Sequence, residues 1–497
     1  MKYTKNIYLV VLLAFLVSCD NAYDFEQPGR LSADAAFQDV SDLELGILAS
    51  YGQLDATFEV EFTTTFTDEI SIGFDNGGQG LTDGKYGFIL NSSSDGPASI
   101  WANSYAIINS TTRIIEAAAN ISPEDGERAR YDNVLGEAHA IRAYAHFQLF
   151  SYFTTDYTND GAPCVIAVDF IPSIDQELPR NTNGEVLALI NRDLDMAAGL
   201  LPAQSSVTFI NQDFVTALRA RIAAYRGDYA TARNHAETLL ARYPLANPQQ
   251  YIDMFLDIDV TEVIFKLERS IGDGYDTQGF TGGGLMGSLW AFINSTIQGS
   301  PYFEMGRAVF NKFDPMDVRL AVNLDVTSLI DPNYASNPNF QTDDILVIAK
   351  YPGSDGVPLM NDHKIFRASE MLLIKAEAQA DANELNGSVN SVAASLKQLR
   401  DARFGSDQPL PEFSSQADAF GAILDERRLE FLFEGHRYKD LKRLGERGNR
   451  EIDRDPIDCA INGACTLPNS DHRWTMPIPQ LEMDGNSVIR DQQNPGY

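Results

Sequence analysis

The sequence predicts a mostly α-helical protein, arranged as an array of about four helix pairs with long irregular loops between them. Apolar residues recur at spacings of 3 and 4 over several segments, which is typical of amphipathic helices. Alanine-rich helical hairpins recur along the chain, and two glycine-rich stretches interrupt the pattern. Since stacked repeats share one continuous core, we expect residues 19–497 to form a single domain despite their number.

The first predicted helices lie in the N-terminal third of the chain. Residues 31–51 are expected to form one helix. Helical spacing resumes over residues 101–118, and a second helix is predicted over residues 128–153. Because Ser122-Pro123 separates these two segments, we expect them to form an antiparallel pair.

The clearest repeat unit covers residues 214–242. Its alanines allow a second helix to approach closely, and Gly227-Asp228-Tyr229 supplies the turn. This pattern is typical of a tetratricopeptide-type hairpin. A further pair is predicted over residues 369–383 and 389–404.

The segment 415–445 is predicted to be one long helix. Ser415 is expected to cap it, and an apolar stripe should face the core: Phe420, Ile423, Leu424, Phe431, Tyr438, Leu441 and Leu444. A charged row runs beside this stripe, at spacings that let each acid meet a base on the same face: Arg427, Glu430, Glu434 and Arg437. We interpret the row as a buried, self-paired seam, because no nucleophile or metal ligand occupies a neighbouring helical position.

Two long loops combine glycine with aromatic and polar residues. The first spans residues 73–99 and the second spans about residues 270–363. Long loops inside compact chains tend to be functional. We expect the second to form irregular surface rather than part of the repeat core.

The N-terminus carries a predicted secretory leader, with two lysines before eleven apolar residues that end at Val17. The tetrad Leu16-Val17-Ser18-Cys19 resembles a bacterial lipobox, so residues 1–18 are predicted to be a lipoprotein signal peptide and Cys19 the lipidated residue. A plain signal peptide is the alternative. An uncleaved anchor is disfavoured because spanning a bilayer takes about 20 apolar residues.

The remaining cysteines and the overall charge limit which bonds, cofactors and partners are expected. In an exported chain, Cys459 and Cys465 are expected to form a disulfide, which leaves Cys164 unpaired. No cofactor is predicted; residues 156–161 offer oxygen ligands for a structural calcium ion, but a solvated turn is favoured because the EF-hand pattern is incomplete. The net charge of −32 argues against a nucleic-acid partner.

Several segments resemble the SusD/RagB family. The run from Glu426 to Leu441 is similar to the family's C-terminal signature, and Met476-Pro477-Ile478-Pro479-Gln480 with Gln493-Asn494-Pro495-Gly496-Tyr497 is similar to its ending. Residues 136–144 resemble the tetratricopeptide-like helix of the family. The resemblance therefore covers most of the chain.

This resemblance implies a lipid-anchored, surface-exposed outer-membrane protein of a Bacteroidetes-type bacterium. It would bind an oligosaccharide or polysaccharide and deliver it to a SusC-like TonB-dependent transporter, with no catalytic residue. It also implies a SusD-like division of the single domain into an N-terminal repeat part (19–269), a loop-rich glycan-binding excursion (270–365) and a C-terminal repeat part (366–497).

The resemblance maps the glycan surface onto residues 68–104 and 270–307. Sugar rings stack on aromatic faces and form hydrogen bonds with polar side chains, so these loops provide suitable residue types. Burial as a core anchor is the alternative role for Trp101. The candidate glycan-binding residues are Trp290, Trp101, Tyr86, Asp75, Asn76, Tyr302 and Arg307.

Two other functions stay open. A helical-fold polysaccharide-degrading enzyme would need paired carboxylates at a cleft, for which the sequence has no local signature. A protein-interaction scaffold would use the repeats alone and leave the two loops without a role. Because the chain is strongly acidic, a neutral glucan, fructan or mannan is favoured over a polyanionic glycan.

Overall fold

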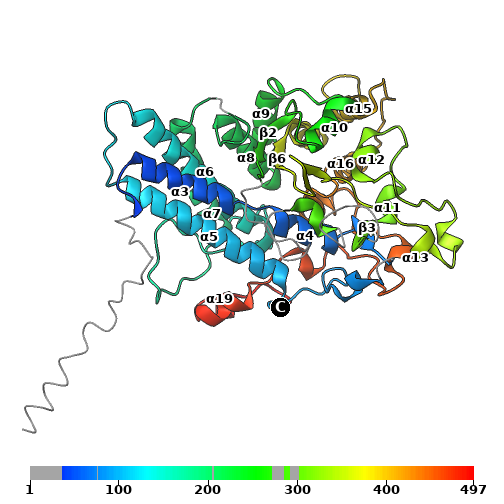
Figure 1. The fold of residues 1–497 in the computed structure, drawn as a ribbon, viewed down its shortest axis with the longest axis horizontal. Coiled ribbons are helices and arrows are strands. Elements are labelled where there is room, and N and C mark those ends of the chain that lie inside the picture. Colours follow the sequence, from blue (N-terminus) through cyan, green and yellow to red (C-terminus); the bar gives the residue numbers. More distant parts are fainter. Residues whose placement is uncertain (1–35, 75–76, 204–205, 271–284, 291–300) are drawn as a thin grey trace, which may run out of the picture.

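The computed structural model describes residues 36–74, 77–203, 206–270, 285–290 and 301–497, which are mostly helical (Figure 1). The longer helices are α3 (Val40–Gln53), α4 (Thr57–Phe66), α5 (Asp95–Ala118), α6 (Arg128–Phe153), α7 (Asn183–Leu200), α8 (Gln212–Tyr225), α9 (Tyr229–Leu240), α10 (Pro248–Phe255), α14 (Ala368–Asp381), α15 (Val392–Phe404), α16 (Gln416–Glu430) and α17 (Arg437–Leu444). The short helices are α11 (Arg307–Phe310), α12 (Val318–Asn323), α13 (Phe340–Asp343), α18 (Pro456–Cys459) and α19 (Gln480–Gly485). Within the described ranges, no helix combines the length and apolar character needed to cross a membrane.

Helix α6 is central to the N-terminal part, where it packs between α5 and α7 (Figure 1). The predicted helices at 101–118 and 128–153 are confirmed, although α5 begins earlier than expected. The predicted helix at 31–51 is confirmed from Val40 onward, and residues 31–35 lie outside the described part of the chain. Helix α7 was not predicted, although its Thr182 side chain accepts from the Glu185 backbone amide in a capping box.

The predicted tetratricopeptide-type hairpin is confirmed as α8 and α9. The chain reverses at Gly227, whose φ of +74° suits glycine, and the Asp228 side chain caps α9 by accepting from the Thr231 amide. The second predicted pair is confirmed as α14 and α15, and α14 also packs against α9 and α16. The repeats therefore form one continuous array.

The prediction of a single helix over residues 415–445 is wrong. Ser415 caps α16 as expected, but α16 ends at Glu430 and α17 begins at Arg437. Between them the backbone is left-handed at Phe433 (φ 64°) and Gly435 (φ 81°), which no helix can accommodate. The predicted apolar stripe is nevertheless buried on both helices.

In the part of the chain that the structure describes, six short strands form three antiparallel pairs. They are β1 (Ile70–Ile72) with β3 (Phe303–Met305), β2 (Val263–Leu267) with β6 (His363–Arg367), and β4 (Gly353–Ser354) with β5 (Val357–Pro358). The expectation that residues 270–363 are irregular surface is wrong for much of the described part. Side chains from this region fill a second apolar core, in which they pack against residues of α4, β1 and the α16–α17 turn. The core residues from this region include Leu289, Trp290, Phe303, Val309, Leu346 and Tyr351.

The predicted disulfide between Cys459 and Cys465 is confirmed. Cys164 is a free, buried thiol, and burial raises its pKa to about 12. It therefore behaves as a small core residue rather than as a nucleophile.

Candidate functional site

The pairing of β1 with β3 brings the two predicted glycan-binding loops together. Ile72 pairs with Phe303, and beyond the strands the Gly73 amide donates to the Tyr302 carbonyl at 3.0 Å. The approach is so close that a Cβ atom at Gly73 would lie 2.0 Å from the Pro301 carbonyl oxygen. Segments separated by more than two hundred residues therefore share one face.

This β1–β3 face, which we define by Phe74, Asp83, Lys85 and Tyr302, combines aromatic rings with charged groups. Both rings are half-buried, and the Lys85 Nζ lies 3.1 Å from a carboxylate oxygen of Glu61 and 3.1 Å from one of Asp83. Burial acts to lower the pKa of Lys85, but the two acids outweigh burial and raise it. Burial and the Asp83 charge raise the pKa of Tyr302. Such a face can stack on a sugar ring and bond to its hydroxyls.

Tyr86 and Arg307 lie beneath this face rather than on it. Tyr86 is 1% exposed and donates its Oη to the Asp458 carbonyl at 2.9 Å. Arg307 is buried, pairs with Asp344 at 2.9 Å, and stacks its guanidinium over the Tyr334 ring. The prediction that these two side chains contact a glycan directly is therefore wrong.

The two predicted tryptophan platforms are also buried. Trp101 is 1% exposed, donates its Nε1 to Glu482 at 3.1 Å, and packs edge-on against Phe153, so its alternative role as a core anchor holds. Trp290 is 3% exposed and stacks on Tyr351 in the second core, with a ring separation of 5.8 Å. Its prediction failed because the segment around Trp290 shows no apolar periodicity, although the core that it joins also contains helical residues.

Among the predicted glycan-binding residues that the structure describes, Tyr302 is thus the one that lies at the surface of the β1–β3 face. Asp75, Asn76 and the lipidation site Cys19 lie outside the described residues and stay predictions. Phe74, Asp83 and Lys85 were not predicted. Their position in the glycine-rich loop was a usable signal, since they flank the predicted Asp75, Asn76 and Tyr86.

Three carboxyl groups are buried under the strand pair. Burial raises the pKa of Glu69 and of Glu304 to about 8, and that of Asp458 to about 7. Glu304 accepts from the Leu346 amide at 3.1 Å. These groups lie in the interior and do not line the face itself.

Among the described residues, no group of three or more His, Cys, Asp or Glu side chains could hold a metal ion. In the turn considered for calcium, Asp156 accepts from the Thr158 amide at 2.8 Å and Asp160 pairs with Arg226. The protein's own donors therefore engage both carboxylates.

Two family models match the chain and together cover more than half of it. The SusD family model matches residues 316–497, and a model described as "Starch-binding associating with outer membrane" matches residues 75–223. The chain belongs to the SusD/RagB family. SusD-like protein P2 of Formosa agariphila is 26% identical over 530 residues, which cover 99% of each chain, and SusD-like protein P38 of the same organism is 24% identical over 90% of this chain and 93% of its own.

Solved structures share the SusD fold along nearly the whole chain. A SusD superfamily protein from Bacteroides thetaiotaomicron has a TM-score of 0.75 at 21% identity and covers 92% of this chain and 100% of its own. A putative sugar binding protein from Bacteroides vulgatus has a TM-score of 0.74 at 22% identity, covering 93% and 99%. Surface glycan-binding protein A from Bacteroides fluxus has a TM-score of 0.69 at 20% identity, covering 92% and 99%. These likenesses confirm the predicted mostly helical SusD-like fold.

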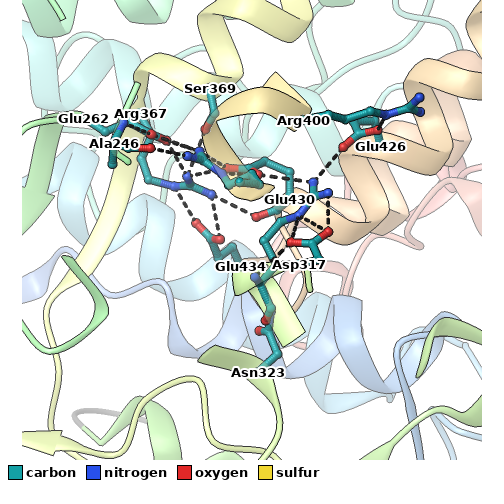
Figure 2. Close-up of polar contacts among 12 residues, drawn as sticks. Ala246, Glu262, Asp317, Asn323, Arg367, Ser369, Arg400, Glu426, Glu430 and Glu434 are labelled. Atoms are coloured by element: carbon teal, nitrogen blue, oxygen red, sulfur yellow. Dashed lines mark hydrogen bonds and ion pairs between the residues drawn. The ribbon is translucent and has the colours of Figure 1, made fainter. Parts of the chain in front are cut away.

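The SusD-family signature of this chain lies on a buried ionic network (Figure 2). Glu430 accepts from Arg367 at 2.8 Å and from Arg403 at 2.7 Å, and Arg319 lies 3.5 Å away. Glu434 also pairs with Arg367. The charged row is therefore buried as predicted.

The prediction that the row pairs with itself is wrong, because the break between α16 and α17 separates its members. Arg427 pairs instead with Asp440 at 2.7 Å, and Arg437 pairs with Asp68 at 2.8 Å. The row thus joins α16 to α17 and both helices to distant segments, rather than neutralising one helix face.

Proposed function

We propose that this protein is a surface-exposed, lipid-anchored glycan-binding protein of the outer membrane. It captures oligosaccharides without catalysis and passes them to a SusC-like TonB-dependent transporter. The observation that carries this proposal is the β1–β3 pairing, which joins two loop segments into one aromatic and polar face in a SusD-family chain. One of the similar structures is a surface glycan-binding protein, which supports the same role.

A neutral glycan fits this face better than a polyanion. Lys85 is already paired with Glu61 and Asp83, which weakens its attraction for an anionic ligand. The net charge of −32 adds long-range repulsion against polyanions. A glucan, fructan or mannan is therefore the expected ligand class.

The location rests on the leader and on the family. The description of the matching model associates its members with the outer membrane, and the predicted lipidation of Cys19 would provide the anchor. Cys19→Ala should therefore release the protein from membranes. If this variant still fractionates with outer membranes of cells that lack the transporter, the lipid anchor is wrong.

The function is tested by incubating the purified protein with soluble starch, laminarin, inulin and mannan. Retention without turnover supports a binding protein, whereas release of shorter sugars would indicate an enzyme. Tyr302→Ala should weaken retention at least about tenfold, because a truncated aromatic anchor often costs ~2 kcal/mol. The matched control is Phe170→Ala, which removes an exposed ring in the loop before α7 and should change nothing. Equal binding by both variants would contradict the assignment of the face.

A further inference from the structure

The disulfide hairpin, which we define as residues 454–465, touches both segments of the β1–β3 face. The Asp458 carbonyl accepts from the Tyr86 Oη at 2.9 Å, and Tyr86 belongs to the first segment. The Asp458 carboxylate accepts from the Arg307 amide at 2.7 Å, and Arg307 lies two residues after the end of β3 in the second segment. One residue therefore holds both sides of the face.

Arg454, at the start of the hairpin, provides a second attachment. Its guanidinium lies 4.0 Å from the ring centroid of Tyr86 and 4.4 Å from that of Phe88. It also donates to the carbonyls of Thr65 at 3.1 Å and Thr67 at 2.8 Å, at the end of α4. The first segment is thus fixed to α4 through the hairpin.

The disulfide keeps these two attachments together. The Arg454 amide donates to the Cys465 carbonyl at 3.1 Å, and Cys459 directly follows Asp458. Bonding Cys459 to Cys465 therefore ties the Asp458 end of the hairpin to the Arg454 end. Without the bond, Cys465 and its hydrogen-bond partner Arg454 lose their covalent tie to Cys459, so the hairpin is less constrained.

The strand pair needs such external support. β1 and β3 contain three residues each, and an isolated two-stranded pair is marginally stable in water. The buried carboxyls of Glu69 and Glu304 weaken it further whenever they ionise. The relative position of the two segments thus depends on contacts from outside the strands.

We propose that the disulfide hairpin is the positioning element of the glycan-binding face. Asp458 and Arg454 are positioning residues that hold the two segments in register and touch no ligand. This inference rests on the proposed function for its effect on glycan binding, but its structural part is testable without any ligand.

The ligand-free test compares amide hydrogen exchange in the wild type and in Cys459→Ser/Cys465→Ser. The amides of Gly73, Gly306 and Arg307 should exchange roughly tenfold faster or more in the variant, whereas those of α6 should not change. Asp458→Ala should reproduce the effect. Asp458→Asn, which keeps an acceptor oxygen, should restore protection. Unchanged exchange at the three amides would overturn the proposal.

The ligand test measures retention of the same four neutral polysaccharides. The double serine variant and Asp458→Ala should bind at least about tenfold more weakly than the wild type. Asp458→Asn and the α19 control Asp484→Ala should bind normally. Faster exchange with unchanged retention would overturn the positioning role. If the wild type retains none of the polysaccharides, the proposed function fails, while the exchange data still decide whether the hairpin positions the two segments.

Discussion

Replacing Glu430 with glutamine should lower the free energy of unfolding by about 3–5 kcal/mol. The carboxylate is fully buried and accepts hydrogen bonds from Arg367 and from two nitrogens of Arg403 (Figure 2). Glutamine has nearly the same shape but carries no charge and offers one acceptor oxygen. It therefore leaves buried guanidinium groups with incomplete partners, which is the costly way to break a buried ion pair.

The loss of unfolding free energy in Glu430→Gln should depend on pH in a defined direction. Burial acts to raise the pKa of Glu430, but Arg403 and Arg367 outweigh burial and hold it well below its usual value. A carboxyl whose pKa is lowered on folding contributes stability above its unfolded pKa, and this contribution is lost as the pH falls towards the folded value. The difference between wild type and variant should therefore be largest near pH 7 and shrink towards pH 3.

Urea unfolding curves at pH 7 and pH 3 measure both effects. The matched control is Glu446→Gln, which changes an exposed glutamate just after α17 and should stay within about 0.5 kcal/mol of the wild type. A Glu430→Gln variant that unfolds at the wild-type midpoint at pH 7 would refute the argument, because the network would then contribute no net stability.

Three further substitutions test the description of the second core and of the strand pair. Trp290→Ala should cost about 3–5 kcal/mol of folding stability, because it empties a buried site; a melting temperature close to that of the wild type would show that the ring is not core. Glu304→Gln should stabilise the protein at pH 8.5 but hardly at pH 4.5. The folded pKa of about 8 lies above the unfolded value of 4.5, so the free energy of unfolding of the wild type falls by about 1.4 kcal/mol for each unit that the pH rises between these values. Equal differences in melting temperature between variant and wild type at the two pH values would contradict this. Gly73→Ala should separate β1 from β3 and weaken glycan retention, because its Cβ would overlap the Pro301 carbonyl. The control is Gly52→Ala on α3, whose Cβ would meet nothing within 4 Å. Normal retention by Gly73→Ala would argue against the strand pair as the basis of the face.

The helices that the sequence predicted best are those whose signals are local. Residues 128–153 and 214–242 carry their own periodicity and their own turn residues, so the structure follows them closely. The break between α16 and α17 is different. Phe433 adopts a left-handed backbone while its ring packs in the second core, and this tertiary contact overrides the helical preference of the segment.

Only part of the candidate site was predictable from the sequence. The resemblance mapped the glycan surface onto two loops, and the structure brings described parts of both together at β1 and β3, whereas glycan binding there stays a prediction. The exposure of single side chains was not predictable, since Trp290 and Tyr86 lie in loop sequence yet pack inward. Asp458 carried no local signal at all, because its partners Tyr86 and Arg307 lie 372 and 151 residues away.

The contacts between the two ends of the chain bear on how the protein reaches its final state. Trp101 at the start of α5 bonds to Glu482 of α19, which lies 381 residues later, and the two helices sit side by side in Figure 1. Tyr86 likewise bonds across 372 residues to Asp458. Such long-range pairings need both partner segments to be present, and high contact order slows folding. The N-terminal helices can therefore complete their core only after the last residues have emerged, which would keep an exported polypeptide open during translocation and delay its closure until the whole chain has crossed.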